Sequence, residues 1–82
     1  MSYFVYVIKS LVDGDLYTGS CEDVEKRLHV HNSGKVRSTK SRKPFVLVYK
    51  EICDTRTEAR KRENYLKSGI GRKYLKEKIQ GS

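Results

Sequence analysis

The segment YFVYVIKSLVDGDLYTGS, residues 3–20, decides the fold of this chain. Its first part, residues 3–9, is rich in the aromatic and β-branched side chains that favour a strand. Asp13-Gly14 follows, a dipeptide that tolerates the positive φ of a tight hairpin turn. Residues 16–20 then return as a second strand. The segment therefore predicts an antiparallel β-hairpin.

The predicted hairpin places two tyrosines on one face of the sheet. Directly opposed residues of an antiparallel pair share a face, and the faces alternate along each strand. If Val12 pairs with Asp15, even positions of the first strand oppose odd positions of the second. Tyr6 and Tyr17 then point to the same side, unless a bulge or a three-residue loop changes the register.

The next segment predicts a helix that carries two polar side chains on one flank. Asp23 can cap this helix, which runs to about Asn32, and Gly34 lies just past its end. Arg27 and His31 are four residues apart, so they share one flank of the helix.

Basic residues are concentrated after this helix. The chain has net charge +8, but residues 1–34 carry net −2 and residues 35–82 carry net +10. The loop over residues 35–43, KVRSTKSRK, has five basic residues and no acid. These residues are Lys35, Arg37, Lys40, Arg42 and Lys43. The asymmetry predicts a polyanion held against one side of the protein, with the loop as a phosphate-contacting strip; the alternatives are a solvated basic surface and a disordered loop.

The last part of the chain predicts one strand and two helices. Residues 45–52, FVLVYKEI, read as a third strand. Thr55 begins a capping-box pattern for the next helix, which two glycines, Gly69 and Gly71, are expected to end. A short last helix follows over residues 72–79.

These elements predict a single α+β domain over residues 1–82, with the order β-β-α-β-α-α. Helices packed on one face of a small antiparallel sheet are the natural architecture for this order. No apolar run approaches the ~20 residues of a membrane span, and the N-terminus does not read as a signal peptide. Cys21 and Cys53 form no zinc pattern and are expected to be reduced, so we expect a cytoplasmic protein that does not bind membranes.

Glu63 interrupts the apolar stripe of the helix that follows Thr55. It comes four residues after Ala59 and three before Leu66. Burying an unpaired carboxylate is costly, so Glu63 must pair, become protonated or bind a cation. A salt bridge to Arg60 or Lys67 is one interpretation. A Mg²⁺ or Mn²⁺ site is the other, with substrate phosphate and water completing the metal's ligand shell.

Five residues that precede the predicted third strand have both a chemical and a structural interpretation. Nearby positive charge lowers the pKa of a phenol, so Tyr6 or Tyr17 can accept or relay a proton; either can equally be a core residue. Arg27 offers a fork of donors to a phosphate, or is a surface arginine. His31 is a proton shuttle or phosphate donor, or a helix-end cation. Asn32, beside it, caps the helix or touches the substrate.

The ordered set of motifs resembles the GIY-YIG nuclease superfamily, in particular its small stand-alone members. Residues 4–6, FVY, stand where that family has Gly-Ile-Tyr, and residues 17–19, YTG, stand where it has Tyr-Ile-Gly. Residues 23–34 resemble its arginine helix, and residues 58–67 resemble the helix with its metal-binding glutamate. The resemblance covers residues 3–79.

The resemblance implies an α/β sandwich with a central three-stranded antiparallel sheet flanked by helices. It also implies one divalent ion, Mg²⁺ or Mn²⁺, and hydrolysis of DNA phosphodiester bonds. The catalytic set maps onto Tyr6, Tyr17, Arg27 and His31, the metal ligand onto Glu63 and the site glycine onto Gly19. One tyrosine would be the general base, the arginine would stabilise the pentacovalent phosphate, and the glycine would let the backbone pass close to the site.

Two functions follow from these observations. The first is a metal-dependent DNA endonuclease of repair or recombination, acting on branched, damaged or single-stranded DNA. The second is a nucleic-acid-binding module with little or no catalysis. Larger relatives in the family carry separate DNA-binding or partner domains that this sequence lacks. The contacts that bind DNA would therefore come from the basic loop, the C-terminal helices or a protein partner that supplies specificity.

Overall fold

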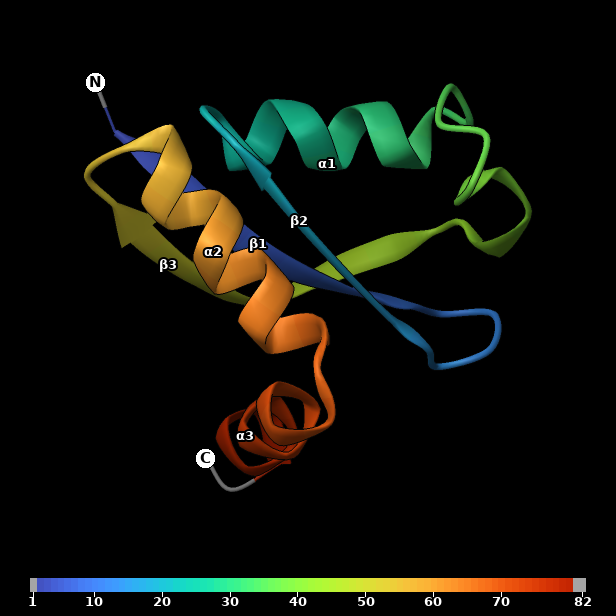
Figure 1. Cartoon of the computed structure of the whole chain (residues 1–82). Helices are drawn as coiled ribbons and strands as arrows, with labels where there is room; N and C mark the ends of the chain where they lie inside the picture. Colours follow the sequence, from blue (N-terminus) through green and yellow to red (C-terminus); the bar gives the residue numbers. More distant parts are fainter. Residues whose placement is uncertain (1, 81–82) are drawn as a thin grey trace.

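A three-stranded antiparallel sheet lies between helices in the computed structural model, which describes residues 2–80 apart from the side chain of Gln80 (Figure 1). The strands are β1 (Tyr3–Ser10), β2 (Leu16–Cys21) and β3 (Phe45–Cys53), in the spatial order β2-β1-β3. The helices are α1 (Val24–Asn32), α2 (Arg56–Lys67) and α3 (Gly69–Gln80), with a 3₁₀ turn at Lys40–Arg42. The observed order β-β-α-β-α-α confirms the predicted α+β class.

The loop of the β1–β2 hairpin is longer than a two-residue turn. The Ser10 amide donates to the Asp15 carbonyl over 2.9 Å, so the strands pair two residues further back than a Val12–Asp15 pair would place them. Gly14 has the positive φ expected of it, at 76°, and the Asp15 amide donates to the Asp13 carboxylate over 2.9 Å.

A shift of two residues preserves the parity of the faces, because side chains alternate with a period of two. Tyr6 opposes Gly19, and Ile8 opposes Tyr17. Tyr6 and Ile8 share a face of β1, so Tyr6 and Tyr17 point to the same side. The prediction of a shared face for the two tyrosines is therefore confirmed.

The sheet separates two hydrophobic clusters. On one face Val5 and Val7 pack against residues of α2 and α3, namely Ala59, Leu66 and Leu75. On the other face Tyr6 and Ile8 pack with Val24 of α1 and with Phe45. Figure 1 shows α1 on the opposite side of the sheet from α2. The expectation that the helices cover a single face is thus wrong, whereas the sandwich implied by the family resemblance is confirmed.

The reason lies in the central strand. The consecutive residues Val5, Tyr6, Val7 and Ile8 are each 2% exposed or less. A strand that buries every side chain in a run needs a cover on both faces, whereas a strand with one wet face alternates apolar and polar residues. Residues 4–8, FVYVI, have no such alternation.

Local capping signals form as the sequence predicts. The Asp23 carboxylate accepts from the Lys26 amide over 3.0 Å at the start of α1, and Gly34 has φ 81° just past its end. The Thr55 hydroxyl accepts from the Glu58 amide over 3.1 Å at the start of α2. These side chains satisfy amides that the first turn of a helix leaves without an intrahelical partner.

The junction of α2 and α3 differs from the prediction. The chain turns at Ser68, which is extended (ψ 167°), and α3 begins at once at Gly69 rather than at residue 72. Ile70 belongs to α3 and is 74% exposed, so it does not extend the buried face of α2. Gly71 is buried inside α3, where a Cβ atom would collide with the backbone carbonyl of Tyr65. Gly71 thus permits close packing of the two helices and does not end α2.

Among the described residues, no helix combines the length and the apolar character that crossing a membrane requires. Cys21 and Cys53 are both free and partly buried.

The α2–α3 junction gives a matched pair of substitutions. Gly71→Ala should lower the free energy of unfolding by about 2 kcal/mol, because overpacking of backbone against Cβ is destabilising. Gly69→Ala should be neutral or slightly stabilising, since a Cβ there meets nothing within 4 Å. Urea unfolding followed by circular dichroism measures both. Equal effects of the two substitutions would contradict this account of the junction.

Candidate active site

A chain of buried polar groups lies on the α1 side of the sheet. The Tyr6 hydroxyl is 3.0 Å from Nε2 of His31, and Nδ1 of His31 is 2.9 Å from the Thr39 hydroxyl. Thr39 in turn donates to the Val36 carbonyl over 3.4 Å. Tyr6, His31 and Thr39 are all at most 2% exposed, so each needs these partners.

The carbonyl of Val36 fixes the direction of this chain, because a carbonyl only accepts. Thr39 therefore accepts from the Nδ1–H of His31. An uncharged His31 then has no proton on Nε2, and this nitrogen accepts from the Tyr6 O–H. In this arrangement His31 is neutral and Tyr6 holds its proton, which makes both residues parts of a fixed frame.

The electrostatics agree with that assignment. Burial raises the pKa of Tyr6 to about 12, although the nearby Arg27 guanidinium acts in the opposite direction. Burial also lowers the pKa of His31 below its usual 6.5, and the positive charge of Arg27 adds to this effect. In the free protein Tyr6 is therefore a poor proton acceptor at neutral pH.

Gly19 is required by the ring of Tyr6, which lies against it across the hairpin. A Cβ atom at Gly19 would come within 2.5 Å of the Tyr6 hydroxyl oxygen and 2.8 Å of its Cζ atom. The glycine therefore serves close approach of a side chain and not an unusual backbone conformation, since its φ is not positive.

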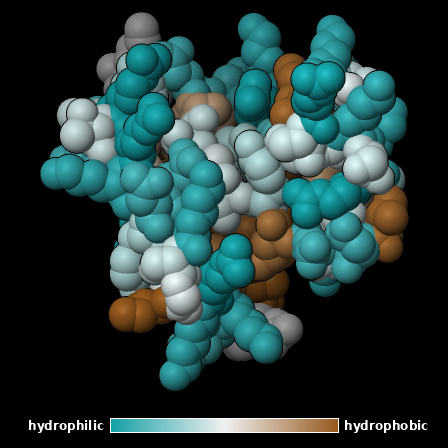
Figure 2. All heavy atoms as spheres, turned by 45° about the vertical axis from the view of Figure 1, so that its right-hand side comes forward, coloured by the Kyte–Doolittle hydropathy of each residue, from teal (hydrophilic) through white to brown (hydrophobic). Residues whose placement is uncertain are grey.

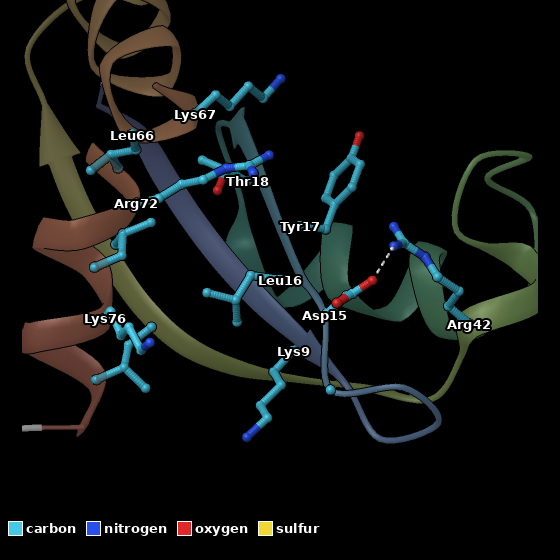
Figure 3. A pocket seen from close by; sticks show the side chains of 13 residues that line it. Lys9, Asp15, Leu16, Tyr17, Thr18, Arg42, Leu66, Lys67, Arg72 and Lys76 are labelled. Carbon is cyan, nitrogen blue, oxygen red and sulfur yellow. Dashed lines mark ion pairs between the residues drawn. The ribbon is translucent and has the colours of Figure 1, made fainter. Parts of the chain in front are cut away.

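Tyr17 occupies a more open position than Tyr6, although the two share a face. It lies on β2, an edge strand, and is only half-buried. Its ring contacts His31 edge-on, with 5.0 Å between the ring centroids. Tyr17 also lines a pocket of about 660 Å³ at the outer edge of β2 (Figure 3). Of the two signature tyrosines, it is the one that a ligand in this pocket can reach.

Glu63 projects from α2 towards the same edge strand, but from the opposite face. Its Oε1 accepts from the Ser20 hydroxyl over 2.8 Å, and its Oε2 accepts from the Lys67 ammonium over 2.7 Å. The Glu63 side chain is 18% exposed. The salt bridge to Lys67 is one of the two pairings expected from the sequence, and Ser20 is an additional partner that the sequence does not indicate.

The pocket wraps around the free edge of β2 and so connects the two faces of the sheet. Tyr17 and Asp15 reach it from the α1 face, because they alternate with Leu16 and Thr18, which reach it from the other face. Lys67 lines the pocket as well and holds Glu63 by its ammonium group. Tyr17 and Lys67 thus line the same pocket at the edge of β2, and Glu63 is linked to it through Lys67.

Arg27 stands apart from this pocket. Its positive charge acts on Tyr6 and His31, and it lines a separate hollow with Cys21 and Phe4 at the other end of β2. The structure therefore places Arg27 beside the Tyr6–His31 pair and not with Tyr17 in the same pocket.

The basic loop is folded, and its cations point in different directions. Arg42 lines the pocket, where its guanidinium lies 3.7 Å from the Asp15 carboxylate (Figure 3). The other predicted phosphate contacts are exposed and do not line that pocket: Lys35, Arg37, Lys40 and Lys43. The Ser10 hydroxyl also donates to the Arg42 carbonyl over 2.6 Å, which ties the loop to β1.

Asn32 fixes the far end of the loop. Its side chain donates to the Phe45 carbonyl over 3.1 Å and accepts from the Phe45 amide over 2.6 Å. Of the two roles considered for it, the cap of α1 is not what the structure shows. The two bonds join the end of α1 to the start of β3 and hold the loop between them.

Sequence reasoning missed the basic residues that α3 and β1 contribute to the pocket, which are Arg72, Lys76 and Lys9. The spacing of Arg72 and Lys76, four residues apart in the last helix, was an available signal, because such residues share a helix face. It did not indicate that this face meets the hairpin.

Comparison with known proteins shows the same architecture and motifs. Residues 2–76 match the family model of the GIY-YIG catalytic domain. The chain belongs to the GIY-YIG family. UPF0213 protein SSP2268 of Staphylococcus saprophyticus is 45% identical over 75 residues, which are 90% of each chain. UPF0213 protein SAV0488 of Staphylococcus aureus is 45% identical over 76 residues, 92% of each chain.

A solved structure shares the fold. The solution structure of UPF0213 protein BH0048 from Bacillus halodurans is 35% identical and has a TM-score of 0.55, over 92% of this chain and 82% of the other. These relatives are small stand-alone GIY-YIG proteins. The GIY-YIG domain is of a nuclease type, whereas the names of the relatives state no substrate, metal or pathway.

The buried His31 of this GIY-YIG domain predicts a dependence of stability on pH. The pKa of His31 is lower in the folded protein than in the unfolded chain, so the unfolded chain takes up a proton first as the pH falls. Protonation therefore favours unfolding, and stability that is present above about pH 6.5 is lost below that pH. The free energy of unfolding should fall between pH 7 and pH 5.5. His31→Gln should lose this dependence, and His29→Gln, a change at an exposed histidine of the same helix, should keep it. Urea unfolding at several pH values measures this; a His31→Gln protein with the original dependence contradicts it.

Proposed function

We propose that this protein is a divalent-metal-dependent endonuclease that hydrolyses DNA phosphodiester bonds at the free edge of β2. One observation carries the proposal: the Tyr17 phenol and the Glu63–Lys67 pair approach that edge from opposite faces, around a basic pocket. Membership of the GIY-YIG nuclease family supports the reaction class.

Tyr17 is the general base in this proposal. Its ring lies in the pocket, where a water molecule next to a bound phosphate can reach the phenol oxygen. Tyr6 is unsuited to that role, because its hydroxyl is buried, donates to His31 and has a pKa raised to about 12. Once its own proton has passed to solvent, the Tyr17 phenolate would take a proton from the attacking water, a contribution that is typically worth ~10²–10⁴ in rate.

Tyr6 and His31 have a positioning role. Their hydrogen bond and the edge-on contact of His31 with Tyr17 fix the Tyr17 ring from the α1 side. Arg27 supplies fixed positive charge beside the Tyr6–His31 pair, but it does not line the pocket, so the proposal gives it no direct contact with a phosphate there.

Glu63 would hold the metal ion. Within residues 2–80, no three side chains of His, Cys, Asp or Glu gather to hold a metal, so the carboxylate would act with substrate oxygens and water. Oε2 of Glu63 lies 2.7 Å from the Lys67 ammonium, so a metal ion would take the place of that ammonium. One carboxylate is compatible with Mg²⁺ or Mn²⁺, since such ions keep several waters. The bound ion would stabilise negative charge on the phosphate.

We take DNA repair or recombination in the cytoplasm as the setting of this activity, with a partner protein as a source of substrate specificity. The supporting observation is the net charge of +8, which suits a polyanionic substrate.

One prediction of this proposal concerns DNA cleavage. Purified protein with Mg²⁺ or Mn²⁺ should nick supercoiled plasmid or cut flap DNA. Tyr17→Phe and Glu63→Gln should each lower the rate by at least about 100-fold. Tyr65→Phe and Glu77→Gln are matched controls, because both side chains are exposed and neither lines the pocket. They should leave the rate unchanged.

Activity that survives Glu63→Gln would point to a contaminating nuclease. A protein that binds DNA tightly without any metal and cleaves nothing in the panel would instead be a nucleic-acid-binding module.

Another prediction of this proposal concerns the affinity for Mn²⁺ in the absence of DNA. Lys67→Met should tighten Mn²⁺ binding about fivefold, because the ammonium no longer competes for a carboxylate whose exposed ion pair contributes ~1 kcal/mol. Lys61→Met changes an exposed lysine on the same helix and should alter the affinity less than twofold. Electron paramagnetic resonance of free Mn²⁺ gives both constants. Weaker binding in Lys67→Met would argue that the metal does not use Glu63.

A further inference from the structure

The pocket at the edge of β2 continues as a groove between the β-hairpin and α3. Leu16 of β2 is 41% exposed and lies near the middle of Figure 3, with Leu66 of α2 to its upper left. Leu75 of α3 lines the groove as well. Hydrophilic residues cover most of the surface in Figure 2, and hydrophobic residues lie in a recess between its upper and lower parts. The groove thus has an apolar floor below a charged rim.

The rim is strongly basic. Five cationic side chains line it and one carboxylate, that of Asp15, so its net charge is +4. The cations are Lys9, Arg42, Lys67, Arg72 and Lys76. Arg42 is paired with Asp15, and Lys67 is paired with Glu63. Within residues 2–80, the other three form no ion pair, so their charges are available to a ligand.

These three cations stand on two sides of the apolar floor. Arg72 and Lys76 project from one face of α3, since they are four residues apart, and Lys9 projects from β1 beside Leu16, its partner across the hairpin. In Figure 3 the two α3 side chains and Lys9 surround Leu16, and Tyr17 lies further along the same strand. A chain of phosphates along this rim would lead to the phenol of Tyr17.

We infer that the groove between the β-hairpin and α3 binds an unpaired strand of DNA, with a base on Leu16 and phosphates on Lys9, Arg72 and Lys76. This inference rests on the proposed function for the nature of the ligand and names which form of DNA the site takes. It assigns the main DNA contacts to α3 and the hairpin, whereas only Arg42 of the loop over residues 35–43 lines the groove.

The apolar floor favours an unpaired strand over a duplex. A duplex presents phosphates and sugars to a protein surface and keeps its bases stacked inside, so it has little apolar area to place on Leu16. A single strand can turn a base onto an apolar surface while its backbone follows a basic groove. The volume of about 660 Å³ lies within the ~300–1,000 Å³ of pockets that enclose small ligands, which suits a nucleotide and not a double helix.

The test measures binding in EDTA, so that cleavage plays no part. A fluorescently labelled 12-nucleotide single strand and a blunt duplex of the same sequence are titrated with the protein, and anisotropy gives the dissociation constants. The pocket variant is Arg72→Gln with Lys76→Gln. The control variant is Lys61→Gln with Lys73→Gln, which removes the same charge from two exposed lysines that do not line the groove. Circular dichroism confirms that both variants are folded.

We expect the single strand to bind at least about tenfold more tightly than the duplex. The pocket variant should weaken single-strand binding about tenfold and reduce the salt slope of log K by about 1.4, because two phosphates are no longer neutralised and each accounts for ~0.7 of the slope. The control variant should weaken binding less than about threefold and keep the slope. Leu16→Gln should reduce the preference for the single strand while leaving the salt slope unchanged.

Equal binding of single strand and duplex, or equal effects of the pocket and control variants, would overturn the inference even if the protein cleaves DNA. The experiment also recognises the opposite case, in which the groove binds DNA but the protein does not cleave it. If the pocket variant alone loses single-strand binding while no metal or substrate yields cleavage, the groove is a DNA site and the proposed nuclease activity is wrong.

Discussion

The burial of β1 on both faces is the constraint on which the rest of this structure depends. Four successive side chains, Val5 to Ile8, are almost completely removed from water, so helices must cover both sides of a sheet that has only three strands. With β1 in the centre, β2 becomes an edge strand, and its outer side is a place where groups from both faces can meet. Tyr17 from one face and Lys67 from the other line the same pocket there, and Lys67 is paired with Glu63. The position of the candidate site is thus a consequence of how the core is filled.

Tyr6 and Tyr17 lie on the same face of the sheet but in two different environments. Tyr6 lies on the central strand and is enclosed by Gly19, His31 and the core, so its hydroxyl is a buried donor in a fixed chain of hydrogen bonds. Tyr17 lies on the edge strand and keeps access to the pocket. A buried polar chain with every member satisfied specifies one arrangement, because any other leaves a group unpaired in a medium of low dielectric constant. The Tyr6–His31–Thr39 chain therefore orders α1 and the basic loop around the more accessible phenol.

Sequence reasoning succeeded where a property is local or periodic. The caps at Asp23 and Thr55 depend on three-residue spacings. The shared face of Tyr6 and Tyr17 depends on the alternation of side chains along a strand, and a register shift of two residues leaves that alternation unchanged. It failed for contacts between distant segments. The Ser20–Glu63 bond joins residues 43 apart and the Tyr6–His31 bond joins residues 25 apart, and no local pattern encodes either pair. The wrong assignment of helices to one face was avoidable, because the run FVYVI at residues 4–8 lacks the alternation of a half-exposed strand.

The departures from the family's signature fall where the structure tolerates them. Phe4 stands in place of the first glycine of the signature, and its ring packs beside the α1-side cluster with the Lys50 ammonium 5.8 Å from the ring centre. Thr18 stands in place of an isoleucine, is 8% exposed and lines the pocket from the α2 face. Neither substitution moves a tyrosine, because Tyr6 is set by the pairing of the central strand and Tyr17 by the hairpin register. Gly19 is different: the Tyr6 ring occupies the space of any side chain there, so that glycine is the signature position that the packing itself requires.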